Sequence, residues 1–113
     1  MNLENYVCTL EQAKKLDKLL GKRESIFYYG ESEDDSPRIY QSGHFAPGKF
    51  IANAYTSQEL GEEIKKLSDY WRQYTASPGK YLFLNERGFF DYSSNSEAHA
   101  RAEFLIYFLK KNK

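Results

Sequence analysis

The sequence is poor in the residues on which cross-linked or adaptable interiors depend. Its 113 residues include one cysteine, Cys8, one methionine and one tryptophan. A single cysteine excludes an intrachain disulfide. With one methionine, the core cannot rely on flexible thioether side chains to fill irregular gaps. The interior must therefore be held by close packing and hydrogen bonds.

The sequence also lacks a surplus of charge of either sign. Lys and Arg total 16 and Asp and Glu total 16, which gives a formal net charge of +0. Nonspecific nucleic-acid binding relies on a basic surplus that neutralises phosphates. The composition therefore argues against such binding overall, although a local basic face stays open. Neutrality also removes one safeguard against self-association.

Long apolar runs are absent too. No run approaches the roughly 20 residues that a helix needs to cross a bilayer. The opening residues, Asn2 to Asn5, are neither basic nor followed by an apolar segment, unlike a secretory signal. Together with the single cysteine, these features predict a protein of the reducing cytoplasm, with no membrane association.

What the sequence does contain is a large number of aromatic residues, with 8 Phe and 10 Tyr. Large rings let a small domain bury much area with few residues. The length is typical of one domain with one real core. No linker or repeat divides the chain, so we expect a single α+β domain over residues 1–113.

Two segments begin with a capping box and continue with helical spacing of apolar residues. Residues 10–20 follow Thr9 and stop at Gly21, which suits a left-handed helix end. The second segment follows Thr56, and its apolar stripe is the longest periodic signal in the chain. The stripe predicts one helix that reaches well beyond residue 70 before Pro78-Gly79; its members are Leu60, Ile64, Leu67, Trp71 and Tyr74.

A third helix is expected over about residues 96–110, where Ser94 and Glu97 can form another capping box. Its apolar residues spread over a wide arc that includes Ile106 and Tyr107. A wide arc indicates either that the helix is sandwiched within the fold or that part of it meets a partner.

Five short runs of β-forming residues separate these helices, at 25–29, 38–41, 49–55, 81–84 and 89–92. Hairpin-length connections between them favour antiparallel pairing. The order is therefore α-β-β-β-α-β-β-α. The simplest architecture is an antiparallel sheet of about five strands with the three helices packed mainly on one face.

His44 is the first candidate for chemistry, because it lies in a loop between Gly43 and Pro47. Such a histidine can act as a general base or a metal ligand, and the acidic segment 31–35 would approach it if the second and third strands pair. The plainer interpretation is an exposed loop histidine beside a solvated acidic turn. No second histidine stands at metal-ligand spacing, and the acidic run lacks the pattern of a calcium loop.

Cys8 and the tyrosines also have both a functional and a structural interpretation. A thiol next to a helix start could be activated, but Cys8 is more simply a small buried hydrophobic residue. Tyr70 lies off the apolar stripe and could reach a binding surface. Tyr74 and Tyr107 are further candidates, because tyrosines line protein interfaces and can stack on bases.

Three patches of the sequence form a distinctive set: 3–16 followed by 25–29, Ala54–Glu62, and Ala98–Leu109. Together they resemble a family of short uncharacterised proteins from bacteriophages and from prophages of gut Bacteroidetes. The resemblance implies an origin in a mobile element and expression inside a bacterial host. It implies no activity and no site residues.

These observations predict a non-catalytic accessory protein, without metal or cofactor, that binds another protein or itself. The binding residues we would expect are Tyr70, Tyr74, Tyr107 and His44. Two alternatives stay open. One is a small-molecule-binding domain or weak enzyme centred on His44, and the other is binding of single-stranded nucleic acid.

Overall fold

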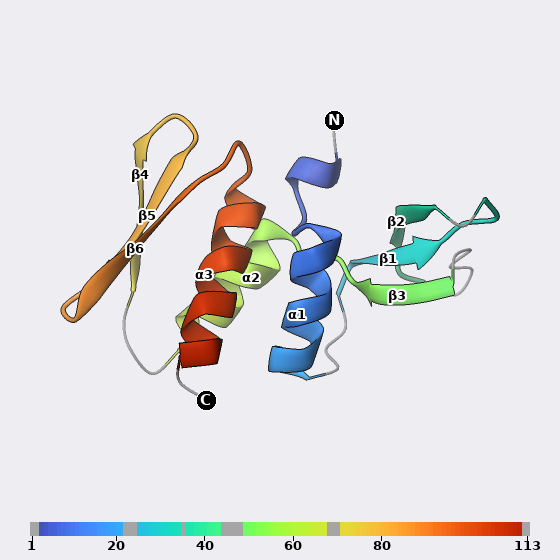
Figure 1. The fold of residues 1–113 in the computed structure, drawn as a ribbon, viewed down its shortest axis with the longest axis horizontal. Coiled ribbons are helices and arrows are strands. Elements are labelled where there is room, and N and C mark those ends of the chain that lie inside the picture. Colours follow the sequence, from blue (N-terminus) through green and yellow to red (C-terminus); the bar gives the residue numbers. More distant parts are fainter. Residues whose placement is uncertain (1–2, 22–24, 35, 44–48, 68–70, 112–113) are drawn as a thin grey trace.

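The computed structural model describes residues 3–21, 25–34, 36–43, 49–67 and 71–111. Over these residues the chain forms three α-helices and six strands in the order α-βββ-α-βββ-α. Figure 1 shows the helices as a central layer with a small sheet at each end of the molecule. The molecule is elongated, with extents of 47 × 31 × 20 Å.

The first helix forms where the sequence predicts it. Helix α1 (Leu10–Leu20) follows a short 3-10 turn at Leu3–Asn5. The Thr9 side chain accepts a hydrogen bond from the Gln12 backbone, and the Gln12 side chain accepts one from the Thr9 backbone. Gly21 follows the helix with φ of 78°, a conformation that only glycine adopts without strain.

The first sheet has strand order β2-β1-β3, with every pair antiparallel. Its strands are β1 (Phe27–Glu31), β2 (Pro37–Gln41) and β3 (Lys49–Asn53). Tyr29 lies opposite both Ile39 and Ala52, and these three side chains face the helices. Helix α1 packs against β3, so this sheet lies to one side of the helical layer.

The second helix is shorter than its apolar stripe predicts. Helix α2 (Ser57–Lys65) begins with the predicted capping box at Thr56, but strand β4 occupies Arg72–Ser77. The prediction of a continuous helix through Tyr74 is therefore wrong. The aromatic and β-branched residues Tyr74 and Thr75 suit a strand, and β5 offers that strand a hydrogen-bonding edge. Trp71 still turns inward, and its ring lies 4.8 Å from that of Phe104.

The second sheet has strand order β4-β5-β6 and is also antiparallel. Strand β5 (Lys80–Asn85) and strand β6 (Gly88–Ser93) form the predicted hairpin. The Asn85 side chain accepts hydrogen bonds from the backbone amides of Arg87 and Gly88 and so closes the turn.

Helix α3 (Glu97–Lys111) is sandwiched within the fold. Seven of its residues are buried, among them Phe104 and Leu105, and it packs on α1, α2 and the second sheet. Its wide apolar arc is therefore covered by this chain itself, and only Tyr107 of that arc is substantially exposed. Its N-cap also differs from the prediction, because Ser96, rather than Ser94, accepts the hydrogen bond from the His99 amide.

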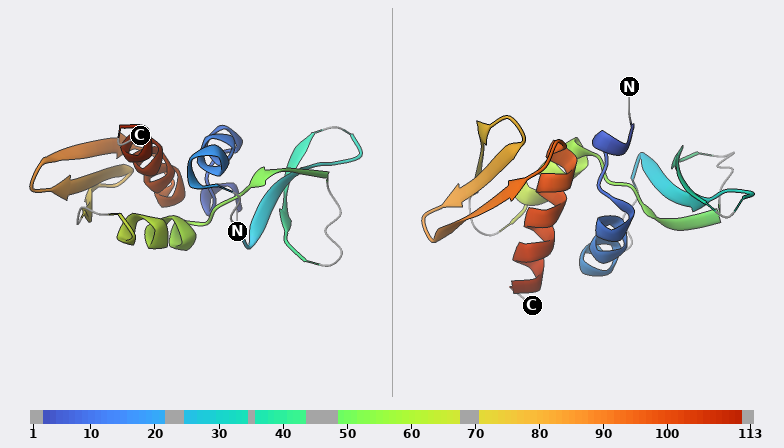
Figure 2. Two further views of the ribbon diagram at one scale, coloured as in Figure 1. Left: turned by 90° about the horizontal axis from the view of Figure 1, so that it is seen from below. Right: turned by 45° about the horizontal axis from the view of Figure 1, so that its top comes forward.

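The α+β class and the antiparallel pairing are confirmed, whereas the sheet is divided in two. A single sheet would leave one side of α3 exposed, and the second sheet covers that side (Figure 2). The core is divided accordingly. One cluster, built on residues such as Leu16, Leu60 and Leu105, lies between the helices and the first sheet. The other, built on Phe83, Phe104 and Phe108, lies between α3 and the second sheet.

Within the described ranges, no helix is both long and apolar enough to span a membrane.

Candidate functional site

The clearest candidate surface is the side of the second sheet that faces away from α3. Side chains alternate along each strand, so Phe83 and Phe90 face the helix while their neighbours face outward. Tyr74 of β4 lies opposite Leu82 of β5, and Leu84 of β5 lies opposite Phe89 of β6. We call this side, with Tyr74, Leu82, Leu84 and Phe89 and the polar Arg72 and Asp91, the outer face.

The apolar residues of the outer face are unusually accessible. Phe89 is 67% exposed and Tyr74 is 45% exposed, while Leu82 and Leu84 are half-buried. Directly opposite residues on neighbouring antiparallel strands have their Cβ atoms about 5 Å apart. The four side chains therefore form one continuous patch across three strands, rather than scattered apolar residues.

Of the two predicted binding residues that the structure describes, Tyr74 lies on this patch and Tyr107 does not. Tyr107 lies on α3, on the other side of the second sheet, and its ring packs 5.0 Å from that of Phe90. The structure therefore does not bring Tyr74 and Tyr107 to one surface. Tyr70 and His44 lie outside the described residues.

Tyr107 borders a cleft of about 400 Å³ near the tip of the hairpin. Trp71, Phe108, Arg87 and Lys111 line it, and Phe89 of the outer face contributes to it as well. The Lys111 ammonium lies 5.7 Å from the centre of the Tyr107 ring. Among the described residues, the indole N–H of Trp71 is buried without a hydrogen-bond acceptor, although Trp71 itself is only half-buried.

A second cleft, of about 540 Å³, separates the start of α1 from strand β2. Leu10, Pro37 and Ile39 provide apolar walls, and His99 reaches it from α3. The His99 side chain donates a hydrogen bond from Nε2 to the backbone carbonyl of Glu4, 2.9 Å away. That bond connects α3 to the first turn of the chain and so gives His99 a structural role.

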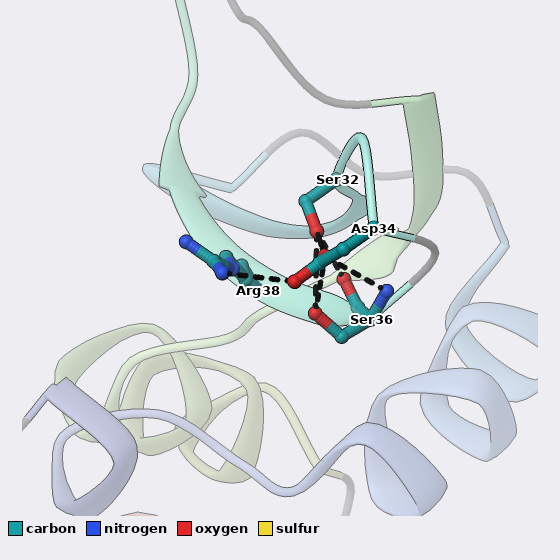
Figure 3. Close-up of polar contacts among 4 residues, drawn as sticks. All are labelled: Ser32, Asp34, Ser36 and Arg38. Carbon is teal, nitrogen blue, oxygen red and sulfur yellow. Dashed lines mark hydrogen bonds and ion pairs between the residues drawn. The ribbon is translucent and has the colours of Figure 1, made fainter.

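The acidic segment that we predicted to approach His44 is organised around Asp34 (Figure 3). Its carboxylate accepts hydrogen bonds from the hydroxyls of Ser32 and Ser36 and pairs with Arg38 at 3.2 Å. The bonds from Ser32 and Ser36 hold the pKa of Asp34 well below its ordinary value. Because all of these partners belong to the β1–β2 hairpin, the arrangement is that of a stabilised turn.

Cys8 is buried, as the simpler interpretation predicts. Burial raises the pKa of its thiol to about 12, so the reactive thiolate is suppressed. The hydroxyl of Tyr29 donates a hydrogen bond of 2.6 Å to the Cys8 carbonyl, which fixes the segment against the first sheet.

A polar cluster joins both later helices to the second sheet. Arg101 donates from Nε to Gln73 at 2.7 Å and from Nη1 to the Ser57 carbonyl at 2.6 Å. Glu97 accepts from the Ser57 hydroxyl at 2.6 Å and from the Gln73 amide at 2.9 Å. Burial alone would raise the pKa of Glu97, but these two bonds and the Arg101 charge lower it.

Gly61 makes room for this cluster. A Cβ atom at Gly61 would lie 2.6 Å from Nη1 of Arg101. Every member of the cluster has partners within the chain, so we assign it a structural role. In the part of the chain that the structure describes, no three His, Cys, Asp or Glu residues are placed to bind a metal ion.

Leu82, Leu84 and Phe89 were not predicted to be surface residues. A signal was present, because 81–84 is apolar without interruption and 89–90 is a pair of phenylalanines. In a hairpin, successive residues face opposite sides, so an uninterrupted apolar run must place apolar residues on both sides.

Comparison of the chain with protein-family models, curated proteins and solved structures finds no match.

Proposed function

We propose that this chain is a non-catalytic binding protein that recognises another protein surface through the outer face of the β4–β5–β6 sheet. The observation that carries the proposal is the exposed patch formed by Tyr74, Leu82, Leu84 and Phe89. Contiguous exposed apolar patches with a polar rim mark interaction sites, and aromatic residues contribute much of their binding energy.

This patch replaces the surface that the sequence suggested. The wide apolar arc of α3 is buried between the two sheets, so it offers little for a partner. On the outer face, by contrast, no described element covers Phe89 or Tyr74. The expected role as a bacteriophage or prophage accessory protein in the bacterial cytoplasm is part of the same proposal, and the three sequence patches support it.

The experiment compares Phe89→Ser with Ile26→Ser. Ile26 is a matched control because it is 54% exposed and lies just before β1, at the other sheet. Tagged protein is tested for complexes with itself and with proteins of a bacterial lysate. We expect Phe89→Ser to lose the complex and Ile26→Ser to keep it. If no complex forms with either source, or if both variants behave alike, the proposal is wrong.

Binding of single-stranded nucleic acid at the same surface is distinguished from protein binding by a gel shift and its salt dependence. Tyr74 and Phe89 could stack on bases, with Arg72 beside them. Such binding would appear in a gel shift at low ionic strength and weaken steeply with salt.

A further inference from the structure

The outer face has a symmetry in its own residue pattern. At one level across the sheet stand Tyr74, Leu82 and Asp91, from β4, β5 and β6. At the next outward-facing level stand Arg72, Leu84 and Phe89. Each level therefore has leucine on the central strand, with a polar or charged group on one edge strand and an aromatic ring on the other.

We infer that the occupant of the outer face is a second copy of this chain, packed sheet on sheet about a two-fold axis parallel to β5. This inference rests on the proposed function and names the partner of the same face. In a two-fold interface, if residue i contacts residue j, then j contacts i. Rotation about β5 places each residue of β4 over the residue of β6 at the same level in the second copy.

The pairs that result are chemically complementary. Tyr74 faces Asp91 of the second copy, so the phenol can donate a hydrogen bond to the carboxylate, and this happens twice. Leu82 and Leu84 meet their own counterparts in the centre. Arg72 faces Phe89 of the second copy, an arrangement that suits a cation over a ring.

The other two-fold axis in the plane of the interface runs across the strands and gives a poorer match. It would place Arg72 over the ring of Tyr74, which is favourable, but it would also place Asp91 over the ring of Phe89, whose face is negative. The carboxylate would then lose water without gaining a donor, which is costly. The charge pattern therefore selects the axis along β5. The net charge of +0 means that two copies meet without overall repulsion.

The first test is the mass of the purified chain by light scattering over a concentration series. We expect wild-type protein and Ile26→Ser to form dimers, and Phe89→Ser to dimerise about tenfold or more weakly. Circular dichroism shows that each variant is folded. A wild-type chain that stays monomeric at the highest concentration overturns the inference.

The second test examines the axis by charge complementation. A dimer of two Tyr74→Asp chains would place the new carboxylate against Asp91 at both contacts. We therefore expect this variant to be monomeric on its own. Mixing Tyr74→Asp with Asp91→Lys creates one Asp–Lys contact and keeps one Tyr–Asp contact, so the dimer should return. Mixing Tyr74→Asp with wild type is the control, and we expect less of the mixed dimer there, because one Asp–Asp contact remains. The mixed dimer is counted apart from wild-type homodimers by pull-down of tagged Tyr74→Asp, and equal amounts of mixed dimer in the two mixtures overturn the arrangement.

The two proposals fail in distinguishable ways. A monomeric chain that captures a lysate protein, and loses it in Phe89→Ser, overturns the second copy as occupant but supports the proposed function. A monomeric chain that captures nothing overturns both.

Discussion

The two sheets at the ends of this molecule attach to one helical layer by different means. The first sheet packs through small and aliphatic side chains, and Ala52 of β3 and Leu16 of α1 belong to one buried cluster. Hydrogen bonds support that packing, since Asp17 accepts from the Asn53 amide at 3.0 Å and from the Tyr55 hydroxyl at 2.7 Å. The second sheet packs through rings, with Phe83 stacked on Phe104 at 4.5 Å.

Their outer faces differ even more. On the first sheet, Tyr28 is only 4% exposed and its ring lies 5.5 Å from that of Tyr40 and 5.9 Å from that of Phe50. Gly30 leaves the room for this group, because a Cβ there would lie 2.9 Å from both tyrosine rings. On the second sheet, Tyr74 and Phe89 remain exposed. The same tyrosine-rich composition thus buries Tyr28 on the first sheet, where Phe50 beside it is 57% exposed, and leaves both Tyr74 and Phe89 exposed on the second.

The sharpest way to separate the two attachments uses neighbouring residues of α3. Phe104 is buried in the ring cluster and Leu105 in the aliphatic cluster. We expect Phe104→Ala to cost about 3–5 kcal/mol and Leu105→Ala about 2–5 kcal/mol, because each leaves a cavity. Urea denaturation measures these losses.

Amide hydrogen exchange then shows which strands lose protection in each variant. Phe104→Ala should accelerate exchange mainly in β5 and β6, and Leu105→Ala mainly in β1 and β3. If both variants loosen both sheets equally, the division of the core into two attachments is wrong.

Gly61→Ala should change the free energy of unfolding by a smaller amount. The sign of the change should depend on whether Arg101 is present. Alanine in a helix interior stabilises by about 1 kcal/mol over glycine. Here its Cβ would displace Arg101 from the Ser57 carbonyl, and a charged hydrogen bond is worth about 1.5–3 kcal/mol. Gly61→Ala should therefore destabilise wild type by about 1 kcal/mol. In an Arg101→Met background, Gly61→Ala should stabilise the protein, because no guanidinium hydrogen bond remains to be displaced. A double-mutant cycle in urea measures both, and the same sign in both backgrounds would contradict the steric argument.

The smallest expected effect is the acid dependence of the attachment of the second sheet. Glu97 has a pKa lowered from its ordinary value of 4.5 in the folded chain. Its contribution is therefore fully present above pH 4.5 and is lost as the pH falls through the lower folded pKa. Urea denaturation is compared near neutral pH and below pH 4.5. The free energy of unfolding should fall more between these two conditions for wild type than for Glu97→Gln. Asp34 keeps its own lowered pKa in both proteins, so parallel losses would exclude a role for Glu97.

Local signals were sufficient for the parts of the fold that local physics decides. The capping boxes at Thr9 and Thr56 form as predicted, because their donors and acceptors lie within four residues. The hairpin at Asn85 forms for the same reason. The end of α2 was not predictable in this way, because Trp71 and Tyr74 fit helical spacing as well as a strand. Pairing with β5 decided between them.

The candidate surface was likewise predictable only in part from local signals. Tyr74 was among the expected binding residues, but as part of a helix, and its neighbours Leu82 and Phe89 were assigned only to a hairpin. The sequence by itself determined the α+β class, the antiparallel pairing, the burial of Cys8 and the apolar residues that a core or an interface must use. Only the tertiary structure decided that α3 is covered from both sides and that one side of the second sheet is left open. The reason is that burial is a property of neighbours far apart along the chain, which local periodicity does not record.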